Sequence, residues 1–171
     1  YYSRARNLHR TAKLLAEQDN LLPVSHEDLR KLPGIGPYTA GAIMSIAYNQ
    51  DFPVVDANIE RLFARLFDIA TPIKSRESKA FVWQKAAAML PAGQSRLFNQ
   101  ALMELGALVC LPRNPRCSQC PLVPWCRAHC LDIIDERPVL PPKKKSIIIE
   151  MATGILMRGE KILIQKRKAD D

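Results

Sequence analysis

Hydrophobic residues recur at helical spacing through most of the chain. After Asp56, the residues Ile59, Leu62, Phe63 and Leu66 would form one apolar stripe of an amphipathic helix. Residues that favour helix starts precede this and other such segments, namely Ser25, Asp56, Ser75 and Ser95. Residues 39–48 are small and apolar, which predicts a helix packed on all sides. The pattern from residue 3 to residue 108 therefore predicts an all-helical region.

The pattern changes after Cys126. Residues 137–145 are rich in proline and lysine and predict a linker. Residues 147–157 and 161–165 resemble two strands joined at residues 158–160. Since a lone hairpin is marginal in water, we expect it to begin a second domain. The expected organisation is a helical core over residues 1–94, a cysteine region over 95–131, a linker over 132–146 and a truncated domain over 147–171.

Composition narrows the function classes. No apolar run approaches the roughly 20 residues of a membrane helix, and the basic first ten residues do not resemble a signal peptide. We therefore expect a cytosolic protein with no membrane partner. The first residue is not methionine and the chain stops after a strand-like run, so we expect an internal fragment. The net charge of +8 fits a polyanionic partner, although charge alone does not identify DNA.

A glycine-rich turn separates two of the expected helices. The segment Leu32-Pro33-Gly34-Ile35-Gly36-Pro37 has two glycines one residue apart, just before an Ala/Gly-rich helix. Glycines allow positive φ and close approach of another backbone, and the amides of a helix start can bind an anion. The alternative is a plain helix-helix turn.

Asp56 lies at an expected helix start, in the segment Val54-Val55-Asp56-Ala57-Asn58. By position alone it is an N-cap. It also follows the glycine turn by about twenty residues.

Four cysteines crowd into 17 residues, with six, two and five residues between successive members: Cys110, Cys117, Cys120 and Cys126. In a chain expected in the cytosol, such clustering indicates metal rather than disulfides. The spacing alone leaves both zinc and an iron-sulfur cluster open, since each accepts four thiolates. Cys130 is interpreted as a packing or free thiol. Arg113 and Arg116 lie in the first loop of the group and could meet phosphate or remain solvated.

Taken together, these motifs resemble the helix-hairpin-helix DNA glycosylases from Tyr1 through Cys126. The resemblance implies that Gly34, Ile35, Gly36 and Thr39 hold DNA backbone and that the cysteines hold a 4Fe-4S cluster. It also implies that Asp56 is the catalytic carboxylate, with Asn58 orienting either Asp56 or the sugar. A carboxylate suits this chemistry because cleavage of the base-sugar bond builds positive charge on the deoxyribose, and the base must first leave the stack.

Two further features resemble the adenine DNA glycosylases. The bifunctional branch of the superfamily carries a lysine two residues after the second glycine, where this chain has Tyr38. The segment Tyr1-Tyr2-Ser3-Arg4-Ala5-Arg6-Asn7 is similar to the one whose first tyrosine wedges into DNA, which implies DNA contacts for Tyr1, Arg4 and Arg6. Tyr38 would then lie in the catalytic pocket. Residues 147–167 resemble the first hairpin of a Nudix-like domain, so the expected fold is mainly α with the start of an α/β domain.

The resulting prediction is a monomeric base-excision enzyme that removes adenine opposite 8-oxoguanine or guanine in double-stranded DNA. It would act in bacterial cytoplasm, or in the nucleus or mitochondria of a eukaryote. The alternatives are an endonuclease III-like glycosylase and lyase, which the tyrosine at position 38 disfavours, and a non-catalytic iron-sulfur DNA-binding module. The family's general acid is a glutamate upstream of the segment that begins at Tyr1, and Glu17, Glu27, Glu60 and Glu77 are expected to face solvent. We therefore expect these 171 residues alone not to turn over.

Overall fold

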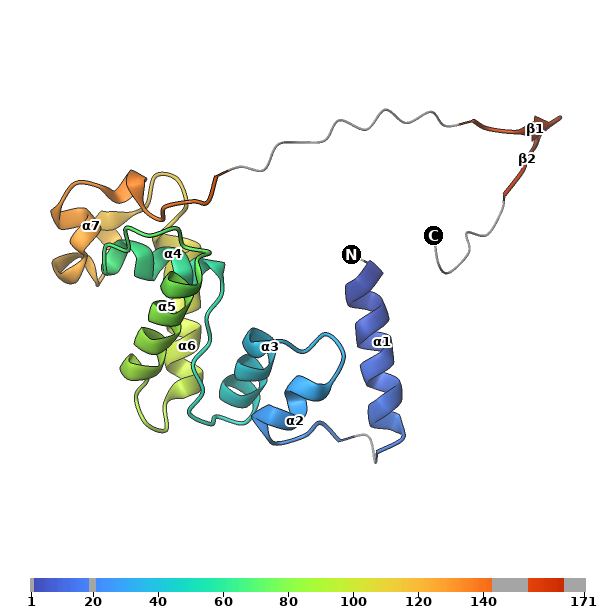
Figure 1. Ribbon diagram of the computed structural model, residues 1–171, viewed down its shortest axis with the longest axis horizontal. Coiled ribbons are helices and arrows are strands. Elements are labelled where there is room, and N and C mark those ends of the chain that lie inside the picture. Colours follow the sequence, from blue (N-terminus) through green and yellow to red (C-terminus); the bar gives the residue numbers. More distant parts are fainter. Residues whose placement is uncertain (1, 19–20, 143–153, 165–171) are drawn as a thin grey trace. The chain divides into compact units, whose positions relative to one another are not determined.

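A computed structural model of the chain describes residues 2–18, 21–142 and 154–164 (Figure 1). The chain divides into two compact units, Tyr1–Pro141 and Pro142–Asp171. Every regular element in the described part of the first unit is a helix, which confirms the mainly helical prediction. Its regular elements are α1 (Tyr2–Ala16), α2 (His26–Lys31), α3 (Pro37–Ala42), η1 (Ile43–Ala47), α4 (Ala57–Leu66), α5 (Arg76–Met89), α6 (Ser95–Glu104), η2 (Leu105–Val109), η3 (Cys117–Gln119), η4 (Val123–Trp125), α7 (Arg127–Cys130) and η5 (Ile134–Glu136). None of the described helices has both the length and the apolar character needed to cross a membrane.

The predicted helix starts are largely confirmed. Ser25 caps α2 by accepting a hydrogen bond from the Asp28 amide at 3.1 Å, and Ser75 caps α5 through the Ser78 amide at the same distance. Such caps satisfy amides that the first turn of a helix leaves without partners. Ser95 differs, because it is the first residue of α6 and its hydroxyl donates to the Gln50 carbonyl oxygen at 2.6 Å.

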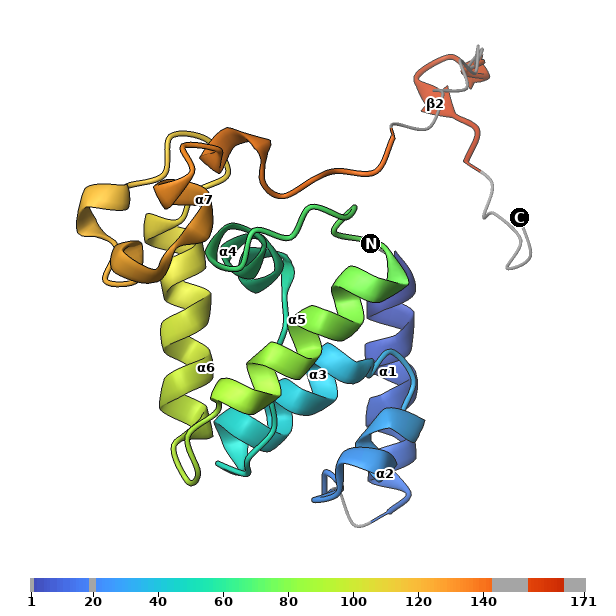
Figure 2. The same cartoon turned by 60° about the vertical axis from the view of Figure 1, so that its left-hand side comes forward.

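The main core surrounds α4. All four residues of the predicted stripe, Ile59, Leu62, Phe63 and Leu66, are buried. Side chains of α5 and α6, among them Val82 and Leu102, complete this cluster. Figure 2 shows α5 and α6 diverging from the loop that joins them, with the cysteine-bearing loops after η2 at one end of α6.

A second, smaller cluster lies inside the hairpin formed by α2 and α3, and consists of Leu29, Ala40 and Met44. The predicted helix over residues 39–48 is present as α3 followed by the π-helix η1. It is not packed on all sides, because Ala47 and Tyr48 at its end are exposed. The structure therefore corrects the expectation of an enclosed helix to one with a single buried face.

The second unit contains one antiparallel hairpin within its described residues. Strand β1 (Met157–Arg158) pairs with β2 (Lys161–Ile162), and Met157 lies opposite Ile162. Gly159 has a φ of +60° and forms the turn with Glu160, where the left-handed backbone favours glycine. Residues 147–153 and 165–171 of the expected domain lie outside the described residues.

Candidate active site and cysteine cavity

The hairpin turn is shaped by close packing against α1. Gly34 has a φ of +80°, and a Cβ added there would lie 2.8 Å from the Cβ of Asn7. The Thr11 hydroxyl of α1 donates to the Pro33 carbonyl oxygen at 2.9 Å, next to this contact. Glycine is therefore required at position 34 both by its backbone conformation and by the approach of α1.

Gly36 has a different environment from Gly34. It is the N-cap of α3 with a φ of −89°, a value open to any residue, and a Cβ added there would meet nothing within 4 Å. Ile35 and Thr39 beside it are half-buried. The space in front of Gly36 is thus open to a ligand. Arg4 and Arg6 are exposed on α1, whereas the expected DNA contact Tyr1 lies outside the described residues.

Asp56 is held at the start of α4 by two hydrogen bonds. One carboxylate oxygen accepts from the Ile59 amide at 2.8 Å and the other from the Asn58 side-chain amide at 2.9 Å. The segment before it is fixed by Asn99, a fully buried residue of α6 that accepts from the Val54 amide and donates to the Phe52 carbonyl. Asp56 itself is half-buried, so the cap leaves part of it accessible.

Arg61 connects Asp56 to the cysteine region. Its guanidinium donates to the Asn58 side-chain oxygen at 3.0 Å, to the Gly106 carbonyl at 2.7 Å and to the Cys110 carbonyl at 2.8 Å. A Cβ on Gly106 would lie only 2.8 Å from the Cβ of Asn58, so the π-helix η2 approaches α4 very closely. Burial lowers the pKa of the Arg61 guanidinium. Both ends of the Asn58 amide are therefore used within the protein.

Tyr38, the other residue expected in the catalytic pocket, is less enclosed. Tyr38 is 42% exposed in the first turn of α3, and its hydroxyl lies 3.9 Å from the Met103 sulfur. Among the hydrogen bonds of the described residues, none joins Tyr38 to Asp56. Glu60 was expected to face solvent, but its side chain is only 14% exposed and pairs with Lys74 at 2.5 Å. The ion pair with Lys74 holds the Glu60 side chain against the protein surface.

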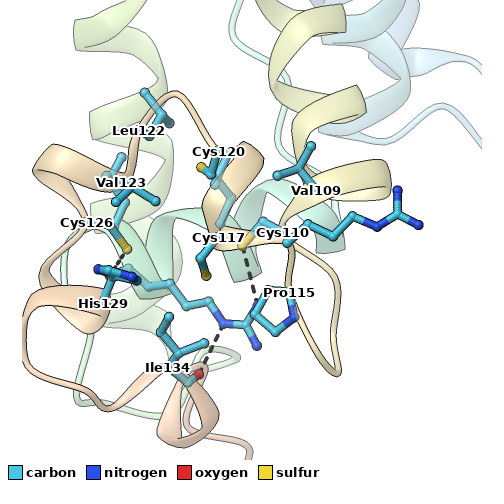
Figure 3. Close-up of a pocket in the computed structure, with 14 residues that line it drawn as sticks. Val109, Cys110, Pro115, Cys117, Cys120, Leu122, Val123, Cys126, His129 and Ile134 are labelled. Atoms are coloured by element: carbon cyan, nitrogen blue, oxygen red, sulfur yellow. Dashed lines mark hydrogen bonds between the residues drawn. The ribbon is translucent and has the colours of Figure 1, made fainter.

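The four cysteines of the group line one cavity between the end of α4 and the loops that follow η2 (Figure 3). Burial raises the pKa of the Cys117 thiol, and the neighbouring cysteines raise it further. Burial likewise raises the pKa of Cys126. This mutual influence is expected of sulfurs grouped around a common space. Cys130 is exposed and does not line the cavity.

The four sulfur atoms lie around a common space rather than in one compact group. In the described parts of the chain, no three cysteine, histidine or carboxylate side chains form a group able to hold one metal ion. The sulfurs instead surround a space, and the remaining cavity wall is mostly apolar, with Leu62, Val109 and Ile134 among its residues. Arg116 reaches this wall while remaining exposed, and Arg113 is exposed in the same loop.

Sequence patterns did not reveal Arg61, Arg65 or Asn99 as site residues. Arg65 lies on α4 beside the buried stripe, so a charge next to an apolar face was the available signal for it. Asn99 had no signal, since its role depends on the contact of α6 with residues 52–54.

Known proteins resemble the chain over most of its length. Residues 19–46 match the helix-hairpin-helix motif family. An adenine DNA glycosylase of Buchnera aphidicola (subspecies Schizaphis graminum) is 36% identical over 151 residues, which cover 88% of this chain and 43% of that protein. The Homo sapiens adenine DNA glycosylase is 44% identical over 131 residues, covering 75% and 24%. The chain thus spans less than half the length of these relatives.

Solved structures agree with this assignment at the level of the fold. A thermostable thymine-DNA glycosylase superposes with a TM-score of 0.65 at 29% identity, covering 73% of this chain and 58% of that one. A non-covalent endonuclease III-DNA complex gives a TM-score of 0.63 at 25% identity, covering 77% and 60%. The chain is therefore similar to the adenine DNA glycosylases over three quarters or more of its length, and its helical unit has the fold of the helix-hairpin-helix glycosylases.

Proposed function

We propose that this chain forms the part of a base-excision DNA glycosylase that hydrolyses the bond between adenine and deoxyribose, opposite 8-oxoguanine or guanine. The observation that carries the proposal is Asp56, a half-buried carboxylate held by the Ile59 amide and the Asn58 side chain, in a chain 36–44% identical to several adenine DNA glycosylases. A fixed carboxylate of this kind stabilises positive charge that develops on the sugar.

Within this proposal Asn58 is a positioning residue. Its amide nitrogen donates to Asp56 and its oxygen accepts from Arg61, which favours orientation of the carboxylate over contact with the sugar. The carboxylate then faces the reacting sugar in one fixed geometry and needs little reorganisation as charge develops. Tyr38, in place of the lysine that would attack the sugar in a lyase, favours hydrolysis by water.

Double-stranded DNA is the proposed partner. The open face at Gly36 would let a phosphate approach the backbone of the turn, and such contacts position DNA without reading bases. Arg4 and Arg6 on α1 and Arg113 and Arg116 in the cysteine region add exposed positive charge. We propose Tyr1 as a wedge beside the mispair from the family resemblance alone.

The cysteine cavity supports a resident 4Fe-4S cluster. Cys110, Cys117, Cys120 and Cys126 would supply the four thiolates. When bound, the cluster would act as a cross-link that closes the loops after η2, much as structural metals do in other small folds. Arg61 donates to the Cys110 carbonyl and to Asn58, and Asn58 in turn donates to Asp56. This chain of hydrogen bonds joins the cysteine loops to the proposed catalytic carboxylate.

A chimera tests the proposal. We would replace the matching 131 residues of the Arabidopsis thaliana adenine DNA glycosylase, which is 44% identical, with those of this chain. Abasic sites formed in duplexes with adenine opposite 8-oxoguanine, guanine or thymine would be revealed with alkali. We expect cleavage of the first two and none of the third. A folded chimera that binds the duplexes but releases no adenine, beside an active parent, would contradict the proposal.

A further inference from the structure

Arg65, near the end of α4, is buried with its positive charge. Only 3% of the residue is exposed, and its guanidinium is surrounded by acceptors. The Nε atom donates to the carbonyls of Ile134 (3.2 Å) and Arg137 (3.0 Å), Nη1 to the Leu111 carbonyl (2.6 Å) and the Cys110 Sγ (3.5 Å), and Nη2 to the Pro112 carbonyl (3.1 Å). These bonds tie the loops on both sides of the cysteines to one side chain.

Within the described residues, four of the five acceptors of Arg65 are neutral backbone carbonyls, and the fifth, the Cys110 sulfur, can carry a negative charge. Among the described residues, no carboxylate forms an ion pair with Arg65, whereas the less buried Arg137 pairs with Asp68 at 2.7 Å. A buried charge without a counter-ion is costly even when its hydrogen bonds are satisfied. A negative charge beside Arg65 would stabilise it, and the carboxylates of the described residues do not supply one.

The cysteine cavity is where that negative charge would lie. Arg65 is part of its wall, together with all four cysteines of the group, which Figure 3 shows around it. A cluster held by four thiolates is anionic, and both nearby charges and hydrogen bonds to its sulfurs set its reduction potential. A guanidinium at hydrogen-bond distance from Cys110 supplies both effects.

We propose that Arg65 is the buried counter-charge of the cysteine-bound iron-sulfur cluster, which it retains and whose reduction potential it raises. This inference rests on the cluster proposed above. The physical reason is that reduction adds a negative charge to the cluster, and a fixed positive charge nearby stabilises the reduced form more than the oxidised form. The same charge favours retention of the anionic cluster over its loss.

Three substitutions in the purified, iron-loaded chain separate charge from hydrogen bonding. Arg65→Met removes the charge and keeps most of the apolar stem, and Arg65→Gln keeps a neutral hydrogen-bond donor. Arg65→Lys keeps the positive charge but not the planar set of N–H donors of the guanidinium. The matched control is the double variant Arg137→Met with Asp68→Asn, which removes a neighbouring pair whose charges already cancel. Iron content, visible absorption during exposure to air, and midpoint potential by protein-film voltammetry are measured for each.

We expect Arg65→Met and Arg65→Gln to shift the one-electron equilibrium at least tenfold toward the oxidised cluster, a lowering of the potential by about 59 mV. Both should also lose iron faster than the control, while Arg65→Lys stays close to the original potential. Unchanged potential and iron retention in the neutral variants would overturn the inference, as would a lysine variant that behaves like them. Absence of iron from the unsubstituted chain would instead refute the proposed cluster itself. If Arg65→Met does not fold, the difference in potential and iron retention between Arg65→Gln and Arg65→Lys tests the inference.

Discussion

Asp56 combines a structural role and a proposed chemical role, and the two can be separated by substitution. Asparagine is as good an N-cap as aspartate, whereas alanine removes the cap at a cost of about 1 kcal/mol. In the chimera, we predict that Asp56→Asn leaves thermal stability and duplex binding nearly unchanged and lowers the single-turnover rate of adenine release by roughly a hundredfold or more, because a preorganised charge is lost.

The control for Asp56 is the cap of α5. Ser75→Ala removes a comparable cap, the hydrogen bond to the Ser78 amide, at a site away from Asp56. It should lower stability by a similar amount to Asp56→Ala and leave the rate of adenine release unchanged. A full rate in Asp56→Asn would mean that the residue is only a cap.

At the scale of elements, the two glycines of the hairpin make distinct predictions. Gly36→Val should fold almost normally, with a loss of about 1 kcal/mol or less at the N-cap, because its φ is ordinary and its surroundings are open. We predict that DNA affinity falls nevertheless, and by a similar factor for every duplex sequence, since the added side chain would block approach of the phosphate backbone. Fluorescence anisotropy at several salt concentrations measures this.

Gly34→Ala tests the other glycine of the hairpin, whose role is in folding. Its φ of +80° and the contact with Asn7 predict a clear loss of stability, seen as a lower melting temperature. Weaker binding in Gly36→Val that is confined to one base context would count against backbone contacts at the hairpin.

Some of the observed helices could be predicted from the sequence and others could not. Periodicity and capping residues predicted α2, α4 and α5, because these signals are local and the structure uses them as expected. The π-helices η1 and η2 were not predicted, since a π-turn depends on how a helix is packed rather than on its composition. The hydrogen bonds from Arg61 to the Gly106 and Cys110 carbonyls were missed because they join segments 45 and 49 residues apart, a contact that no local pattern reports.

At the scale of the molecule, the cysteine-bearing segment over residues 110–137 has little structure of its own. Between residues 110 and 137 it contains only short helical turns, and its apolar cover is thin, with Trp125 at 69% and Leu131 at 54% exposed. The core around α4, by contrast, is made of fully buried side chains such as Phe63 and Val82. The two parts of the helical unit should therefore respond differently to loss of a cross-linking metal group.

We predict that the purified chain is brown and carries about four iron atoms, and that stripping the cluster by oxidation and chelation loosens residues 110–137 first. Helical content by circular dichroism should fall, and limited proteolysis should cut within this range while residues 57–104 stay protected. The reason is that the thiolates are the main cross-link of a region with few buried apolar side chains. Serine substitution of exposed Cys130, outside the cavity, is the control and should leave iron content unchanged. A colourless protein with stoichiometric zinc, or an unaltered cleavage pattern after stripping, would contradict this prediction.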